Sequence, residues 1–388
     1  MPRIKIENNG MLSGIRIVEW SENRAAALAA MLLAEQGAEV LSISTSDAKP
    51  MDPEFAYIFN HKKIVFKINN QSSQDLNKVS KLIESADIFL EDLGVHTFKQ
   101  YGISYHQIST TKNPGLISCS LPGYPESNPR SSENWMEQEV CNEAGVYEHL
   151  TGLGKPEYFP LPLASTYTAF HAINAIVMAL IARHRNNRGQ HIEIPLVSAA
   201  QTLQTVKFLL QSKPPVCWST YQMFASPFMG IWKTADNGYI YLHIGIPRHL
   251  WSFVLLLGKM GFLSEKKELE KNISKKTKMD PAIVNSMREA IKIFRILRKL
   301  FLNKDALYWE KTLSYEGLCC VKIRTVSEWI FSPQALKSGD IEMVTNQMNQ
   351  KKIIIGSPLS FQNGHNINTS SSNFILSLIL GYSRIMEL

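Results

Sequence analysis

The sequence predicts an α/β protein in which residues 1–211 build most of a parallel sheet and a smaller α+β unit follows. Three observations lead to this prediction. Strand-like and helix-like segments alternate up to about residue 200. The chain of 388 residues is longer than one ordinary hydrophobic core requires. The pattern of predicted strands and helices changes after residues 212–215, a linker-like Ser-Lys-Pro-Pro segment.

The first elements form a predicted βαβ unit. Residues 15–18 are typical of a buried strand, residues 25–36 of an Ala- and Leu-rich helix that ends at Gly37, and residues 40–43 of a second strand. The turn between the first strand and the helix lacks the Gly-x-Gly-x-x-Gly pattern that lets backbone amides approach a pyrophosphate. We therefore do not expect NAD or FAD to bind there.

Further strands are predicted at residues 64–68, 88–90, 116–121 and 191–196. Helices are predicted at residues 74–85, 166–185 and 197–210, the second ending in the turn-like Asn-Asn-Arg-Gly-Gln segment 186–190. Strands joined by crossover helices pair in parallel, because the helix returns the chain to the same edge of the sheet. This order predicts a parallel sheet with helices on its faces.

The remaining sequence is divided into a linker and small domain, residues 212–325, and a return to the large domain, residues 326–388. A strand is predicted at residues 239–244 and a final helix at residues 373–380. Residues 288–301 have apolar residues at helical spacing with basic residues between them. We interpret them as an amphipathic helix with a solvated basic face; contact with a membrane surface, nucleic acid or an acidic partner stays open.

The composition indicates an ordinary globular protein. Hydrophobic residues make up 45% of the chain and charged residues 19%, which argues against disorder. No apolar run approaches the roughly 18 residues that a membrane span needs, and the first residues lack the apolar core of a signal peptide, so we expect a cytoplasmic location. The five cysteines have no Cys-x-x-Cys spacing, so we expect neither a disulfide framework nor a metal site.

Short motifs carry a stronger signal when they are taken together and in order. They include Leu-Ser-Gly-Ile-Arg-Ile-Val-Glu at 12–19, Leu-Ala-Glu-Gln-Gly-Ala-Glu-Val at 33–40, Ala-Asp-Ile-Phe-Leu-Glu at 86–91, the segment 113–123 beginning Asn-Pro, Arg-Gly-Gln at 188–190, Trp-Lys-Thr-Ala-Asp-Asn-Gly-Tyr at 232–239, Ser-Pro-Gln at 332–334 and Leu-Gly-Tyr-Ser at 380–383. This series resembles the class III CoA-transferases over nearly the whole chain.

The resemblance implies a Rossmann-like large domain with a smaller inserted domain, and two chains threaded through each other as interlocked rings. The second chain is either another copy, giving a homodimer, or a related chain, giving a heterodimer. Coenzyme A or an acyl-CoA and a carboxylic acid are the expected substrates. No bound cofactor, metal, nucleic acid or membrane span is expected.

The family uses one aspartate at the start of the long middle helix, and its position falls on Ser165 when counted back from the Arg-Gly-Gln motif. The aspartate forms a mixed anhydride with the acyl group and then a thioester with CoA. A serine hydroxyl has no carbonyl carbon at which the CoA thiolate could be captured. We expect Ser165 to cap the helix ahead of Thr166. A nucleophilic role is the less favoured alternative, because His171 lies on another face of the helix.

The resemblance also places five residues at positions that line the CoA site in relatives: Arg24, Asn60, Lys62, Asp92 and Gln100. Asn60 and Lys62 retain the family's Asn-x-Lys pattern, whereas Arg24 replaces a glutamine, Asp92 an asparagine and Gln100 an arginine. An added carboxylate and a lost arginine make the binding of CoA phosphates less favourable.

The nearby cations Arg24, His61, Lys62 and Lys63 could compensate for these changes. The histidine that the racemase branch of the family needs falls on or near Met136, so racemase activity is the least expected family activity.

Three functions remain open from the sequence. The first is a CoA-transferase whose carboxylate comes from elsewhere, with Glu157 as the nearest upstream candidate. The second is a catalytically silent subunit that pairs with an active CoA-transferase chain. The third is a repurposed acyl-binding or scaffold protein that uses the basic helix.

Overall fold

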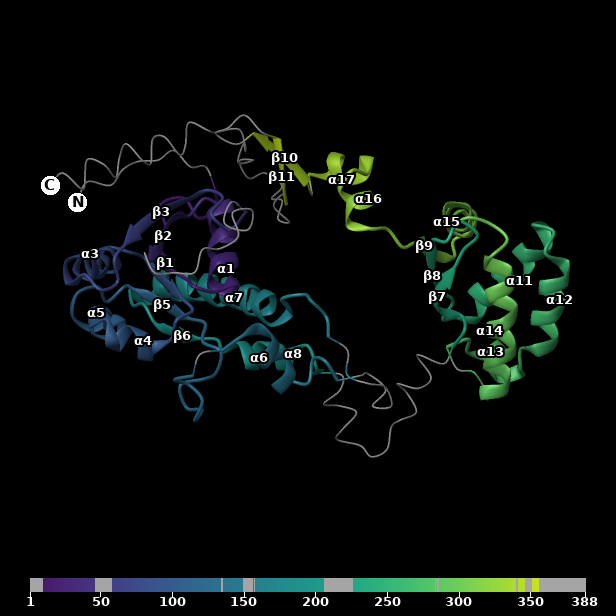
Figure 1. Cartoon of the computed structure of the whole chain (residues 1–388), viewed down its shortest axis with the longest axis horizontal. Coiled ribbons are helices and arrows are strands. Elements are labelled where there is room, and N and C mark those ends of the chain that lie inside the picture. Colours follow the sequence, from purple (N-terminus) through teal and green to yellow (C-terminus); the bar gives the residue numbers. More distant parts are fainter. Residues whose placement is uncertain are drawn as a thin grey trace. The chain divides into compact units, whose positions relative to one another are not determined.

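The computed structural model describes residues 10–45, 58–133, 135–148, 156, 158–205, 226–282, 284, 286–339, 341–345 and 351–355. The chain forms two compact units (Figure 1). The described residues up to 205 belong to a large unit, together with residue 339 and the described residues after it. The described residues from 226 to 338 form a small unit.

The large unit contains a six-stranded sheet in the order β3-β2-β1-β4-β5-β6. All neighbouring strands pair in parallel. The strands are β1 Arg16–Trp20, β2 Glu39–Thr45, β3 Lys63–Ile68, β4 Ile88–Glu91, β5 Ile117–Ser120 and β6 His191–Glu193. The predicted α/β class with a parallel sheet is confirmed. The strand order reverses between β1 and β4, and in doubly wound folds ligands bind outside the carboxyl ends of the strands at this point.

Helices cover both faces of this sheet (Figure 1). One core contains residues of α1 Arg24–Glu35, α6 Glu137–Glu143, α7 Leu163–Asn186 and α8 Leu196–Thr202. The opposite core contains residues of α3 Ser73–Glu84, α4 Val95–Gln100 and α5 Tyr105–Thr111. Alternate residues of a strand point to opposite faces, so Ile17 of β1 enters the first core and Val18 the second.

Small side chains bring α1 and α7 close together. Ala26 and Ala30 of α1 and Ala169 and Ala172 of α7 are all buried in the same core. Alanine is also the best helix former, so the same residues favour both the helices and their close packing. The strand β6 is shorter than predicted because Pro195, which lacks an N–H, already stands before α8.

The helix α7 is the described helix whose length and composition would allow it to cross a membrane. Part of α7 packs in the core of the large unit, so we assign it as a core helix that packs on the sheet. Its C-cap residue, Asn187, has a left-handed φ of 56°. Gly189 follows, and a Cβ atom there would lie 1.9 Å from the carbonyl oxygen of Leu116. The turn predicted at the end of this helix therefore depends on glycine at position 189.

The small unit is α+β. Its antiparallel sheet has the order β7-β8-β9. The strands are β7 Met229–Lys233, β8 Tyr239–His243 and β9 Cys319–Lys322, and the helices are α11 Pro247–Lys259, α12 Leu263–Asn272, α13 Lys275–Met279, α14 Met287–Phe301, α15 Ala306–Tyr315, α16 Val326–Ile330 and α17 Pro333–Ser338. A separate antiparallel pair, β10 Ile341–Thr345 and β11 Lys351–Ile355, follows. The final helix predicted at residues 373–380 lies outside the described residues.

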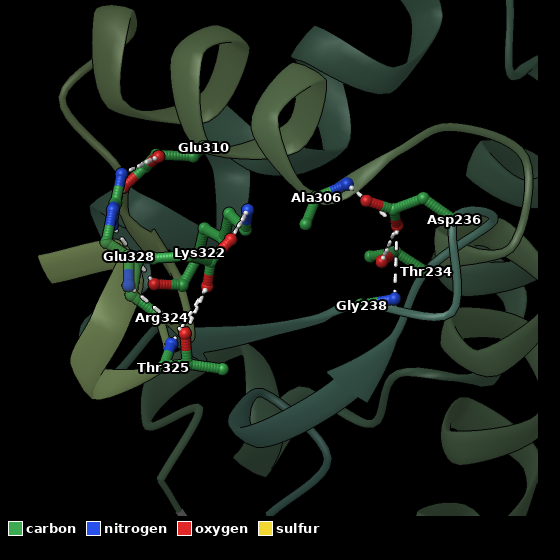
Figure 2. Close-up of polar contacts among 9 residues, drawn as sticks. All are labelled: Thr234, Asp236, Gly238, Ala306, Glu310, Lys322, Arg324, Thr325 and Glu328. Carbon is green, nitrogen blue, oxygen red and sulfur yellow. Dashed lines mark hydrogen bonds and ion pairs between the residues drawn. The ribbon is translucent and has the colours of Figure 1, made fainter. Parts of the chain in front are cut away.

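Polar contacts tie the turn between β7 and β8 to the start of α15 (Figure 2). The Asp236 carboxylate accepts a hydrogen bond from the Thr234 hydroxyl at 2.6 Å and from the N–H groups of Gly238 and Ala306, each at 3.3 Å. The hydrogen bond from Thr234 is the main cause that lowers the pKa of Asp236. These three hydrogen bonds of the Asp236 carboxylate hold the turn and the start of α15 together, so we assign this carboxylate a structural role.

Candidate functional site

Ser165 lies inside the first turn of α7 rather than before it. The helix begins at Leu163, and Pro162 is its N-cap residue. The prediction that Ser165 caps the helix is therefore wrong. Pro162 has no N–H of its own, and its carbonyl oxygen accepts the Thr166 hydroxyl at 2.6 Å, so the helix starts earlier than its polar residues indicate.

The Ser165 hydroxyl instead donates a short hydrogen bond to the carboxylate of Glu137, on α6. Ser165 is 3% exposed, whereas Glu137 is half-buried. The same carboxylate accepts the N–H of Ala164 at 2.7 Å and the N–H of Ser165 at 3.1 Å. Both amides belong to the first turn of α7, where N–H groups have no partner within the helix and attract negative charge. The structure therefore places a carboxylate directly beside position 165.

Sequence reasoning missed Glu137. It selected Glu157, which lies outside the described residues. The contact joins residues 28 positions apart in two different helices, and no local spacing predicts such a contact. The available signal was the N-terminal position of Glu137 in a short acidic helical segment.

Two other sequence expectations concern acid–base groups. Met136, at the position that the resemblance gives to the racemase histidine, is 59% exposed and has no group that accepts a proton. His171 is exposed on α7, and its Nε2 lies 3.5 Å from the Thr202 hydroxyl. Neither residue supplies a base to Ser165 in the hydrogen bonds of the described chain.

The Asp92 side chain contacts the segment that leads into α1. Asp92 follows β4 directly, and its buried carboxylate accepts the N–H of Glu22 at 2.9 Å and that of Asn23 at 3.2 Å. Burial raises the pKa of Asp92 to about 8, with a smaller contribution in the same direction from Glu91. A carboxylate of this chain thus stands at the start of a helix that faces the switch point of the sheet, where an anionic ligand is often bound in such folds.

Lys63 is not available to such a ligand. Its Nζ donates to Glu19 Oε2 and to the Ala27 carbonyl oxygen, each at 2.8 Å, and the Lys63 and Glu19 side chains are both fully buried. Burial lowers the pKa of Lys63, while Glu19 opposes that shift. The interpretation of Lys63 as a compensating cation for CoA phosphates is therefore wrong. Lys63, on β3, forms its ion pair with Glu19 on β1, two strands away in the sheet.

A second buried carboxylate completes this part of the large unit. Glu91 Oε2, at the end of β4, accepts the N–H groups of Leu93 and Gly94, each at 2.8 Å. Burial raises the pKa of Glu91 to about 6. Sequence reasoning did not single out this group, because Glu91 ends an otherwise apolar strand and nothing local indicates that Glu19 and Glu91 both act electrostatically on Asp92.

The other residues assigned by resemblance lie at different places in the large unit. Arg24 is exposed at the start of α1, and Gln100 is exposed at the end of α4. Asn60 and Lys62 belong to the turn before β3, where the Asn60 carbonyl oxygen accepts the Lys63 N–H at 3.1 Å and Lys62 has a left-handed φ of 59°. Their part in CoA binding stays a prediction.

The described residues contain no group of three or more His, Cys, Asp or Glu side chains that could hold a metal ion. Cys119, Cys141, Cys319 and Cys320 are free thiols. The chemistry available at position 165 is therefore that of a carboxylate, a hydroxyl and two backbone amides. Together with the doubly wound sheet, these features define an α/β protein with an anion-stabilising helix start beside a partly exposed carboxylate.

Comparison with known proteins specifies the family. A family model described as CoA-transferase family III matches residues 12–371. The chain belongs to CoA-transferase family III, and the resemblance inferred from the sequence motifs is confirmed. The fold agrees: a crystal structure of a CaiB/BaiF family protein from Brucella suis shares 20% identity, covers 92% of this chain and 94% of its own, and gives a TM-score of 0.76.

Curated relatives are distant in sequence. A CoA-transferase/lyase of Marinomonas sp. is 29% identical over 50% of this chain and 24% of its own length. The succinate–glutarate CoA-transferase of Agrobacterium fabrum is 25% identical over 60% of this chain and 63% of its own. The formyl-CoA:oxalate CoA-transferase of Escherichia coli is 22% identical over 90% and 89%. The chain thus spans less than two thirds of the length of the first two relatives.

Proposed function

We propose that this chain transfers CoA between carboxylic acids, with Glu137 supplying the carboxylate that carries the transferred group. The observation that supports this proposal is the contact of the Glu137 carboxylate with the Ser165 hydroxyl and with the Ala164 and Ser165 amides at the start of α7. The family uses an aspartate at the helix position of Ser165. A glutamate from α6 presents the same functional group to the same helix start.

The chemistry of a carboxylate is sufficient for this reaction. A Glu137 oxygen attacks the acyl-CoA carbonyl, the carbon–sulfur bond breaks, and a mixed anhydride and CoA thiolate are formed. The thiolate then attacks the glutamyl carbonyl and releases the first carboxylic acid as its carboxylate, leaving CoA on Glu137 as a thioester. An acceptor carboxylate repeats both steps in reverse, which returns the free Glu137 carboxylate and a new acyl-CoA.

The groups around Glu137 would stabilise this sequence. Attack of the thiolate on the glutamyl carbonyl places negative charge on a carboxyl oxygen of Glu137. Oε2 accepts the Ser165 hydroxyl and the Ser165 N–H, and Oε1 accepts the Ala164 N–H. Preorganised donors of this kind stabilise a developing oxyanion more than they stabilise a neutral carbonyl. Ser165 is thus assigned as an oxyanion donor rather than as a nucleophile, and the thioester is expected on residue 137.

A second function is favoured by different residues. Asp92 accepts the N–H groups of Glu22 and Asn23 just before α1, and Lys63 is paired with Glu19. Both arrangements occupy groups that could otherwise have bound CoA phosphates. They favour the alternative in which the chain is a catalytically silent subunit that pairs with an active CoA-transferase chain.

The proposal includes an assembly of two chains. Outward-facing apolar side chains form a stripe along α7, on the helix that carries Ser165: Tyr167, Phe170, Val177, Met178 and Ile181. A contiguous apolar surface of this kind is typical of an interface. We assign it to contact with a second copy or a related chain. The four cysteines among the described residues are free thiols, which supports a reducing compartment, so a cytoplasmic location is part of the proposal.

The test is trapping of the covalent intermediate. The purified chain is incubated with a panel of acyl-CoAs and a dicarboxylic acid, and intact-mass measurement and hydroxylamine trapping locate any CoA thioester. Wild type is expected to carry the adduct on residue 137. The Glu137→Gln variant should lose it, and Ser165→Ala should transfer CoA about 100-fold more slowly, as when one oxyanion donor is removed.

Glu139→Gln is the matched control, because the Glu139 carboxylate lies on the same helix and accepts the Met136 N–H at 3.1 Å, away from the start of α7. It should retain the adduct. An adduct that persists in Glu137→Gln would falsify the assignment of Glu137. A wild type without activity, combined with an active Ser165→Asp variant, would instead support the silent subunit.

A further inference from the structure

The helix α14 of the small unit exposes a basic face that no other described element neutralises. Its inner face contributes Ile293, Leu297 and Leu300 to the core of this unit. Its outer face carries the cations Arg288, Lys292, Arg295, Arg298 and Lys299, all of them exposed. Within the described residues none of these five cations forms an ion pair. They form a surface that we call the α14 face.

The acidic residue of α14 is removed from this face. Glu289 is buried, and its carboxylate accepts the N–H of Ser274 at 2.7 Å. The charge imbalance extends through the unit: residues 226–338 contain 19 Lys and Arg against 10 Asp and Glu, a net charge of +9, whereas the whole chain carries +7. The positive charge of the protein is therefore concentrated in the small unit.

Apolar side chains are interspersed with the cations. Ile291 is 45% exposed, Phe294 is 50% exposed, and Leu302, directly after the helix, is 45% exposed. The Phe294 ring packs on one side against Trp232, with ring centroids 4.6 Å apart, so its position is fixed while its other side stays open. The α14 face thus combines an apolar surface with a row of positive charges that have no ion-pair partner in the described part of the chain.

We infer that the α14 face binds the surface of an anionic membrane. The negatively charged lipid headgroups pair with the five cations. The boundary between the headgroups and the acyl chains buries Ile291, Phe294 and Leu302. A nucleic-acid backbone would satisfy the cations equally well but would leave these side chains in water. The helix lies on the surface and does not cross the membrane, because its inner face is the core of the small unit.

Vesicle co-sedimentation of the full chain tests this inference. Vesicles of phosphatidylcholine with about 30% phosphatidylserine are compared with vesicles of phosphatidylcholine alone. The chain should bind the anionic vesicles, and added salt should weaken that binding. Each basic residue near such a surface contributes about fivefold to binding, so Arg295→Glu with Arg298→Glu should weaken it at least about 25-fold. Phe294→Ser should weaken it while preserving the salt dependence.

The matched control is Lys267→Glu with Lys271→Glu on α12, which makes the same change in net charge on exposed residues of the same unit. It should change binding by less than about threefold, because its charges lie outside the α14 face. Unchanged thermal unfolding of each variant shows that the small unit is intact. Equal binding to both kinds of vesicle, or equal loss in the control, overturns the inference. So does binding to duplex DNA without binding to vesicles.

Discussion

Replacing Asp92 with asparagine tests whether a buried carboxylate destabilises the large unit at neutral pH. The Asp92 carboxylate accepts the N–H groups of Glu22 and Asn23, and burial raises its pKa from 3.8 to about 8. An asparagine side chain keeps an oxygen acceptor for these amides but carries no charge. Aspartate and asparagine have nearly the same shape, so packing changes little.

The sign of the effect follows from the raised pKa. The folded state holds the proton of Asp92 more tightly than the unfolded state, so this group's contribution to stability is full below about pH 4. It is lost as the pH rises toward 8. Across this range, the free energy of unfolding of wild type should fall by up to about 1.4 kcal/mol per pH unit relative to Asp92→Asn. Glu91 is present in both proteins, so most of its own titration cancels in the difference.

Urea unfolding of both proteins between about pH 5 and pH 9 measures this difference. Asp92→Asn should be the more stable protein at neutral pH, with a gap that widens as the pH rises and becomes constant above about 8. Asp75→Asn is a control for which the stability difference should change with pH in the opposite direction, because hydrogen bonds from Asn69 and Lys78 lower the pKa of Asp75. A stability difference for Asp92→Asn that does not change with pH would refute the reasoning.

Three further changes probe the fold. Lys63→Met leaves Glu19 buried without its partner and should lower the free energy of unfolding by about 3–5 kcal/mol; adding Glu19→Gln should recover part of it. Gly189→Ala should lower it by about 1–3 kcal/mol, because the new Cβ meets a backbone carbonyl at 1.9 Å; no loss in urea unfolding would contradict this. Asp236→Ala should cost about 1 kcal/mol in the small unit, measured by thermal unfolding, with Asp236→Asn less affected.

Strands and helices of the large unit could be predicted because their signals are local. Alternation between the two cores follows from successive strand residues, as with Ile17 and Val18, and the Ala-rich pattern of α1 matches its burial. The start of α7 could not be placed as well. Ser165 and Thr166 are typical cap residues, yet their hydroxyls bond to Glu137 and to the Pro162 carbonyl inside the helix.

The candidate site was less predictable than the fold because its contacts are distant in sequence. Glu137 meets Ser165 across 28 residues, and Lys63 meets Glu19 across 44. A lysine at the first position of a strand is usually solvated, and only the partner on another strand turns it inward. The order of the motifs drew attention to position 165, but the carboxylate that contacts Ser165 belongs to Glu137, which lies outside those motifs.

The contact of Lys63 with Glu19 links the edge of the sheet to its centre. β3 is the edge strand of the six-stranded sheet and pairs with β2 there, yet the Lys63 side chain reaches β1 and the Ala27 carbonyl of α1. Local opening of β3 would expose or separate two buried opposite charges, which raises the free energy of that opening. The amide protons at the start of β3 should therefore exchange with solvent together with those of β1, as one cooperative unit, instead of exchanging early as a fraying edge.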